Sequence, residues 1–119
     1  PAFGTWLDAM ARDPAAGVNA YNAAVERHPG AQLRPLAARP DQARWELPLW
    51  RVRPGEPRRP VYSPQLAQID PAQLAPRALL MTAIVRAFLC DLFIHGLGGG
   101  AYDRATDDWL RDWLAIDLA

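Results

Sequence analysis

The chain has 119 residues, and its 13 arginines balance its 13 acidic residues, so the formal net charge is zero. A neutral chain has no overall field that draws it to nucleic acid, and we therefore expect no nucleic-acid partner. Half of the residues are hydrophobic, which excludes a disordered chain, and the length suits one hydrophobic core. The lone Cys90 excludes an internal disulfide. We expect a single domain over residues 1–119.

The N-terminal residues lack the basic segment and the long apolar core of a signal peptide, so we expect a cytoplasmic protein. The longest apolar stretch, residues 79–94, is close to membrane length. Arg86 and Asp91 interrupt it and would be costly in lipid. We therefore predict a buried helix here rather than a membrane span, and we expect no membrane partner.

Residues 3–28 predict helix in one or two pieces. Asp13 suits the N-cap of the second piece, and Pro14 suits its first helical position. The apolar residues recur at helical spacing: Phe3, Trp6, Leu7, Met10, Val18, Tyr21 and Val25. The chain then becomes irregular and rich in proline over residues 31–44, which predicts a loop.

Two short runs, residues 45–52 and 59–63, are rich in strand formers and flank the turn segment Pro54-Gly-Glu-Pro57. This arrangement predicts a β-hairpin. Pro48 and Pro60 have no backbone N–H to donate, so we expect edge strands or strands that are only partly paired.

Residues 77–95 are apolar almost all round, which predicts a long, central and buried helix. Arg86 and Asp91 within it must be paired or lie at a polar edge. A last helix is predicted over residues 102–114, with a core stripe that includes Trp109 and Leu110. The predicted fold class is therefore mostly α (α+β), with a central buried helix, flanking helices and a small β-hairpin.

Charge is unevenly distributed along the chain. Residues 27–59 hold eight arginines and three acidic residues, whereas residues 91–119 hold six aspartates and two arginines. One interpretation is a set of solvated faces or an internal seam of ion pairs between the two segments. The other is a basic surface that binds phosphate or another subunit.

A glycine-rich segment joins the two C-terminal helices. Gly96, Gly98, Gly99 and Gly100 occupy four of five positions just before a predicted helix. Such a loop leaves backbone N–H groups uncovered and can cradle an anion. The alternative is a glycine C-cap that ends the long helix, followed by a tight turn.

Three known motifs compete for this segment. Gly96-x-Gly98-x-x-Ala101, with Asp117 further on, fits the dinucleotide fingerprint only if the preceding residues form a strand. A Walker phosphate loop is excluded because the chain has no lysine. Residues 95–99 are similar to the oxyanion loop of an α/β-hydrolase, but the nucleophile elbow that this fold needs does not follow.

His95 and Asp103 are the candidate catalytic residues. His95 suits either a helix C-cap or an acid–base role beside the glycine segment, near Tyr102. Asp103, Asp107 and Asp108 lie in the first turns of the last helix, where they oppose the helix dipole or hold a hard cation or an ammonium group. The spacing of the histidines and cysteine gives no metal-site pattern, so we expect no metal.

Three blocks resemble an uncharacterised family of bacterial proteins that are considerably longer than this chain: Pro76-Arg-Ala-Leu79, Arg86-x-Phe-Leu-x-Asp91-Leu-Phe-Ile-His-Gly-x-Gly-Gly99, and Tyr102-Asp103 with Thr106-Asp107. The family also carries a Glu-x-Pro-x-Trp element, matched by residues 46–50. More remotely, the segment is similar to part of the cysteine-adding enzyme of bacillithiol synthesis. The resemblance implies a fragment of a longer protein whose glycine segment faces a nucleotide or sugar.

The favoured hypothesis is the ligand-binding portion of a larger bacterial enzyme-like protein, which takes an anion, a nucleotide or a sugar phosphate. The candidate binding residues are Arg77, Arg86, Gly96, Gly98, Gly99, Gly100 and Tyr102. The alternative is a structural or protein-interaction module without catalytic activity, whose tryptophans build a core or an interface with the rest of a parent protein or with another subunit. The sequence names no cofactor.

Overall fold

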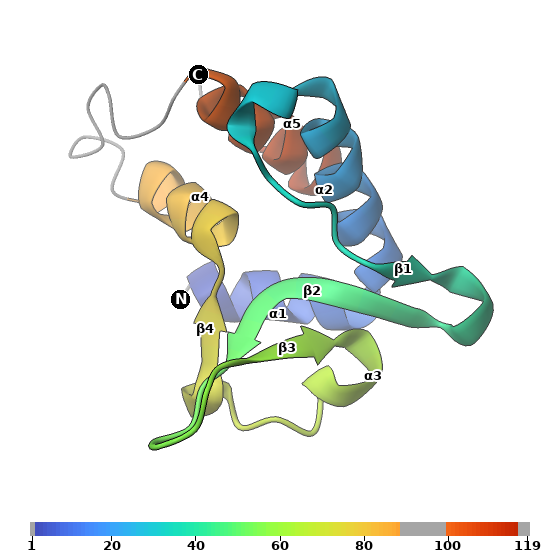
Figure 1. Cartoon of the computed structure of the whole chain (residues 1–119), viewed down its shortest axis with the longest axis vertical. Helices are drawn as coiled ribbons and strands as arrows, with labels where there is room; N and C mark the ends of the chain where they lie inside the picture. Colours follow the sequence, from blue (N-terminus) through green and yellow to red (C-terminus); the bar gives the residue numbers. More distant parts are fainter. Residues whose placement is uncertain (1, 89–99, 117–119) are drawn as a thin grey trace.

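A computed structural model describes residues 2–88 and 100–116, which form a mostly helical α+β fold (Figure 1). The predicted fold class is confirmed. The helices are α1 (Ala2–Arg12), α2 (Pro14–Arg27), α3 (Ser63–Leu66), α4 (Ala78–Phe88) and α5 (Gly100–Leu114), with short 3-10 helices η1 (Pro29–Ala31), η2 (Pro40–Gln42) and η3 (Pro71–Gln73). The strands are β1 (Ala38–Arg39), β2 (Arg44–Arg51), β3 (Arg59–Tyr62) and β4 (Leu74–Pro76).

The N-terminal segment forms two helices that separate at Asp13, as predicted. The Asp13 carboxylate accepts a hydrogen bond from the backbone N–H of Ala16 at 3.2 Å, and Pro14 occupies the first turn of α2. The side chain therefore satisfies one of the unpaired N–H groups at the helix start.

Helices α2 and α5 lie against each other and carry the aromatic part of the core. The Trp109 indole N–H donates to the Gly17 carbonyl at 3.0 Å, and the ring of Trp109 stacks on Trp113 and meets Tyr21 edge-on. A Cβ atom at position 17 would lie 3.0 Å from the Trp113 ring, so glycine permits this close approach. The predicted core positions Trp109 and Leu110 are fully buried.

Strand β2 is the centre of the small sheet, with β3 on one side and both β1 and β4 on the other. The predicted hairpin is confirmed, and its turn contains Gly55 at a φ of +75°. Pro48 is compatible with a central strand because β1 pairs only up to Trp45, β4 pairs from Leu49, and the register with β3 shifts between Glu46 and Trp50. The strand is thus only partly paired at Pro48, and β3, which contains Pro60, is an edge strand.

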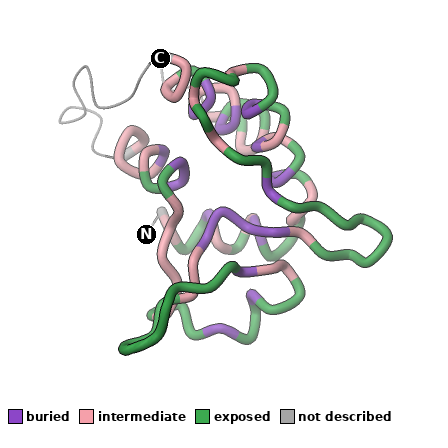
Figure 2. The backbone as a smooth tube through the Cα atoms, in the orientation of Figure 1, coloured by how far each residue is buried: buried purple, intermediate pink, exposed green. Residues whose placement is uncertain are grey.

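Helix α4 begins at Ala78, and residues 89–95 of the predicted helix lie outside the described residues. The described turns of α4 contain buried, intermediate and exposed positions (Figure 2). Leu79, Leu80 and Ala83 are buried in the core, whereas Met81 is 47% exposed. Arg86 is paired, as predicted: its guanidinium contacts the Asp107 carboxylate at 2.8 Å. Among the described helices, none has the length and apolar character to cross a membrane.

A buried ion pair joins the sheet to the start of α4. The Arg77 guanidinium donates to the Glu46 carboxylate at 2.8 Å and to the Leu49 carbonyl at 2.9 Å. The other carboxylate oxygen of Glu46 accepts from the Ala37 backbone N–H at 2.9 Å. The Arg77 guanidinium also lies over the Trp50 ring, 4.0 Å from its centroid. The pair is therefore supported by the Ala37 N–H, the Leu49 carbonyl and the Trp50 ring, while the Nη2 atom of Arg77 has no hydrogen-bond partner in the described part of the chain.

Replacing Glu46 with alanine leaves the Arg77 guanidinium buried without its counter-charge, so we expect the free energy of unfolding to fall by about 3 to 5 kcal/mol. Urea unfolding followed by circular dichroism measures this change. Glu26→Ala is the matched control, because Glu26 is exposed on α2 and forms no ion pair in the described part of the chain; it should change stability by about 0.5 kcal/mol or less. Equal effects of the two substitutions would contradict a structural role for the pair.

Candidate functional site

The glycine-rich segment falls almost wholly outside the described residues. Gly96, Gly98, Gly99 and the candidate catalytic His95 all lie there, and Gly100 is the first residue of α5. Anion binding by this segment therefore stays a prediction.

Three of the other candidates, Arg86, Tyr102 and Asp103, lie together where α4 meets α5. Arg86 donates to the Asp103 backbone carbonyl at 3.2 Å in addition to its contact with Asp107. Burial raises the pKa of Tyr102, although its hydrogen bond with the Thr82 side chain acts in the opposite direction. Asp107 is thus paired with Arg86 of the same chain, and this ion pair joins α4 to α5.

No metal site is found in the described residues, where no three histidine, cysteine or acidic side chains come together in a way that could hold an ion. Asp108 instead serves the contact between α2 and α5. It contacts His28 at 2.7 Å and Arg111 at 2.6 Å, while Asp112 contacts Arg27 at 2.7 Å. These contacts form part of the internal ion-pair seam that the charge distribution suggested.

Arg77 lies apart from the other candidates, in a pocket of about 250 Å³ between α2, β2 and α4. Arg34 and Arg58 also line this pocket, and Arg58 lies over the Trp50 ring at 4.2 Å. Burial raises the pKa of Tyr21, which lines the same pocket, to about 12. The Glu46 carboxylate pairs with two of the three arginines that line this pocket, because it contacts Arg77 at 2.8 Å and Arg34 at 3.7 Å.

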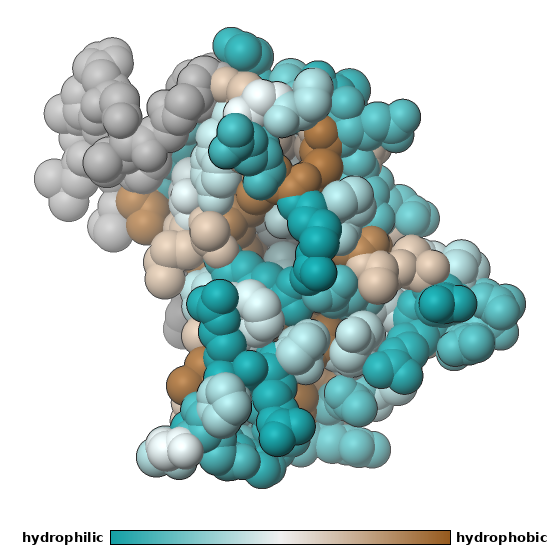
Figure 3. Space-filling view, in the orientation of Figure 1, coloured by the Kyte–Doolittle hydropathy of each residue, from teal (hydrophilic) through white to brown (hydrophobic). Residues whose placement is uncertain are grey.

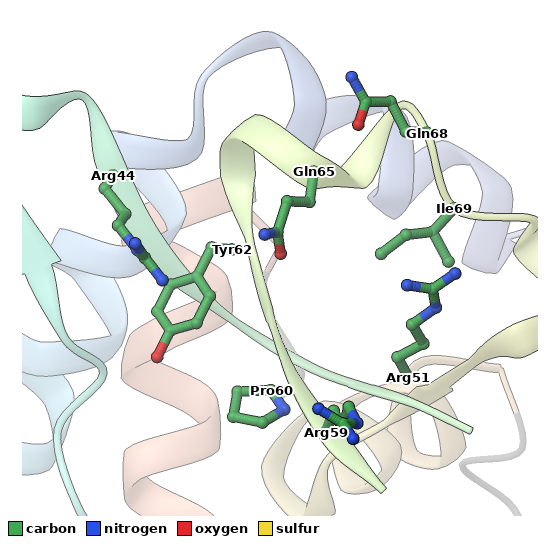
Figure 4. A pocket seen from close by; sticks show the side chains of 8 residues that line it. All are labelled: Arg44, Arg51, Arg59, Pro60, Tyr62, Gln65, Gln68 and Ile69. Carbon is green, nitrogen blue, oxygen red and sulfur yellow. The ribbon is translucent and has the colours of Figure 1, made fainter. Parts of the chain in front are cut away.

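A larger and more basic pocket lies along β2, β3 and the α3 region, and we call it the basic groove. Its volume is about 520 Å³, and α3 with the residues after it forms one wall. The lining side chains come from β2, β3 and the α3 region (Figure 4): Arg44, Arg51, Arg59, Pro60, Tyr62, Gln65, Gln68 and Ile69. Hydrophilic residues also cover most of the strand layer in the space-filling view (Figure 3).

The fold places the groove arginines at the ends of strands. Arg44 and Arg51 are the first and last residues of β2, and Arg59 is the first residue of β3. The Arg44 guanidinium lies 4.0 Å from the centroid of the Tyr62 ring, which holds it on one side of the groove, and Arg51 lies on the other side (Figure 4). Cation–π contact of this kind fixes a guanidinium without neutralising it.

The positive charge of the groove is not paired with a carboxylate in the described part of the chain. In residues 2–88 and 100–116, neither Arg44 nor Arg51 nor Arg59 forms an ion pair with a carboxylate. The Nε atom of Arg51 is buried and has no hydrogen-bond partner among these residues.

The side chains that line the groove are suited to hydrogen bonding with an anion. Arginine binds phosphate and carboxylate through planar, paired N–H groups, and glutamine amides both donate and accept hydrogen bonds. The described lining residues include no carboxylate, histidine or cysteine that would act as a general base or a nucleophile. The arrangement therefore suits an anion held in place.

Sequence reasoning raised a basic surface as one interpretation of residues 27–59 but did not single out these side chains. The signal that could have found the groove was the position of the arginines relative to the predicted strands. Arg44 directly precedes the predicted strand 45–52, Arg51 lies near its end, and Arg59 begins the next predicted strand. The acidic residue between the first two, Glu46, is in a strand position that the fold buries.

Comparisons with known proteins add no assignment: the chain matches no protein-family model, no curated protein and no solved structure. The geometry of the described residues is therefore the basis for the proposals below.

We expect the protein to lose stability in acid. Burial raises the pKa of Glu46 and of Asp108, but hydrogen bonds from Ala37 and Arg77 to Glu46, and from His28 and Arg111 to Asp108, outweigh it and leave both pKa values lowered. A lowered folded-state pKa gives stability that is present above the ordinary values of 4.5 and 3.8 and is lost as pH falls through the folded-state values.

Urea unfolding at a series of pH values from about 6 to about 3 measures this loss, with the slope set by the protons taken up on unfolding. Glu46→Gln should reduce the slope, because it removes one of the two titrating groups. A slope that is identical in the variant would show that Glu46 has the same pKa in the folded and unfolded chains.

Proposed function

We propose that this chain binds an anionic ligand in the basic groove, with the phosphoryl group of a nucleotide or a sugar phosphate as the recognised chemistry. The observation that carries the proposal is the meeting of Arg44, Arg51 and Arg59 at one pocket with no ion pair to a described carboxylate. In the bacterial proteins that the sequence resembles, this binding would belong to a larger enzyme-like molecule.

Electrostatics supports the same ligand class. Arg51 and Arg59 are cross-strand neighbours, so their guanidinium groups repel each other, and a concave surface concentrates their field. A phosphoryl group relieves this repulsion and accepts hydrogen bonds from more than one guanidinium. The volume of the groove, about 520 Å³, is in the range of small-molecule sites.

Removing the guanidiniums should weaken binding without loosening the fold. We expect the double variant Arg51→Gln/Arg59→Gln to bind inorganic phosphate and ADP at least about tenfold more weakly, since hydrogen bonds to charged groups contribute about 1.5 to 3 kcal/mol each. Isothermal titration calorimetry at low salt measures the affinities, and thermal unfolding checks the fold of each variant.

Arg53→Gln is the matched control, because Arg53 is exposed in the hairpin turn and does not line the groove. It should bind both ligands as the parent chain does. A ¹⁵N–¹H correlation spectrum locates the site. Ligand-induced shifts in β2, β3 and α3 are expected, whereas shifts confined to residues 96–103 would move the site to the glycine-rich segment and overturn the proposal.

A further inference from the structure

The basic groove continues into a second pocket. This neighbour has a volume of about 390 Å³ and is lined by Ala37, Arg39, Gln42, Arg44 and Tyr62. Arg44 and Tyr62 line both pockets, so the stacked pair of these two side chains stands between them. The two pockets thus form one extended surface with a wall near its middle.

Each pocket has cationic groups of its own. Arg39 belongs to the second pocket, Arg51 and Arg59 belong to the first, and Arg44 serves both. Like the other three, Arg39 forms no ion pair with a carboxylate in the described part of the chain. Glutamine side chains line both sides of the wall, Gln42 on one and Gln65 on the other.

We infer that the groove takes a ligand with two phosphoryl groups on opposite sides of a sugar, one in each pocket with Arg44 between them. Contiguous phosphoryl groups share a bridging oxygen and fit within one pocket. A ribose instead directs its 3′ and 5′ phosphoryl groups away from each other, so that each can lie in its own pocket while both approach the Arg44 guanidinium, which lines both pockets. This inference rests on the proposed function and specifies its ligand class.

A phosphate–sugar–phosphate unit occurs both in a nucleoside bisphosphate and along a single strand of nucleic acid. The neutral net charge of the chain argued against nucleic acid, but the six arginines of residues 39–59 are concentrated on the strand layer. Local charge governs contact with a strand, because phosphates are neutralised one by one. The two sources share their chemistry, and the experiment separates them.

The decisive comparison uses adenosine 3′,5′-bisphosphate and magnesium-free ATP, which have the same base and sugar and nearly the same charge but differ in where the phosphoryl groups lie. By titration calorimetry of the intact chain, we expect the bisphosphate to bind about tenfold more tightly, which corresponds to about 1.4 kcal/mol. Arg39→Gln should abolish this advantage and leave ATP binding within about twofold of the parent.

If Arg39→Gln does not fold, Gln42→Ala replaces it, because Gln42 also lines only the second pocket. Arg53→Gln is the control variant for both ligands. ATP binding as tight as the bisphosphate, with phosphate still bound, would overturn the inference and leave the proposed function standing. Absence of binding by phosphate, ATP and the bisphosphate alike would overturn both.

A thymidine pentanucleotide separates the two sources. If the pentanucleotide binds more tightly than the bisphosphate, and its affinity falls steeply as the KCl concentration rises, the groove recognises the phosphate–sugar–phosphate unit within a nucleic-acid strand. Weaker binding of the pentanucleotide supports the free nucleoside bisphosphate. Loss of the bisphosphate advantage in the Arg53→Gln control would contradict the assignment to the two pockets.

Discussion

The buried pair of Glu46 and Arg77 determines how the strand layer meets the helices. Two charges removed from water are unfavourable unless each is surrounded by partners, and here the backbone of Ala37, the carbonyl of Leu49 and the ring of Trp50 provide them. The pair therefore fixes the segment before β1, the middle of β2 and the start of α4 in one arrangement. It also turns the acidic side chain of β2 inward, which leaves the outer groove basic.

Local sequence signals gave the elements correctly wherever a few neighbouring residues decide the structure. Asp13 and Pro14 mark a helix start through their own backbone chemistry, and the spacing of Trp109 and Leu110 marks one helix face. The hairpin followed from strand formers around a turn with Gly55. The central position of β2 did not follow, because it depends on β4, which is more than 20 residues away in the sequence.

The candidate site was harder to predict for the same reason. Sequence counts showed an excess of arginine in residues 27–59, but only the fold decides which arginines meet a carboxylate. Arg27 meets α5 and Arg34 lies near Glu46, whereas Arg44 and Arg51 line opposite sides of one pocket. Two of the sequence blocks that carried the resemblance are in contact in the fold. Arg77 of one block contacts both Glu46 and Trp50 of the other, although nothing in the spacing of these residues predicted it.

The pairing of α2 with α5 has a consequence for synthesis of the chain on the ribosome. The ring of Trp113 fills the space beside Gly17 and the indole of Trp109 donates to the Gly17 carbonyl, so the core of a nascent chain stays open at α2 until α5 has left the exit tunnel. Contacts between such distant segments close late and slowly. Until then, the apolar face of α2 that carries Val18 and Tyr21 is available to chaperones, and a truncation before α5 would expose it permanently.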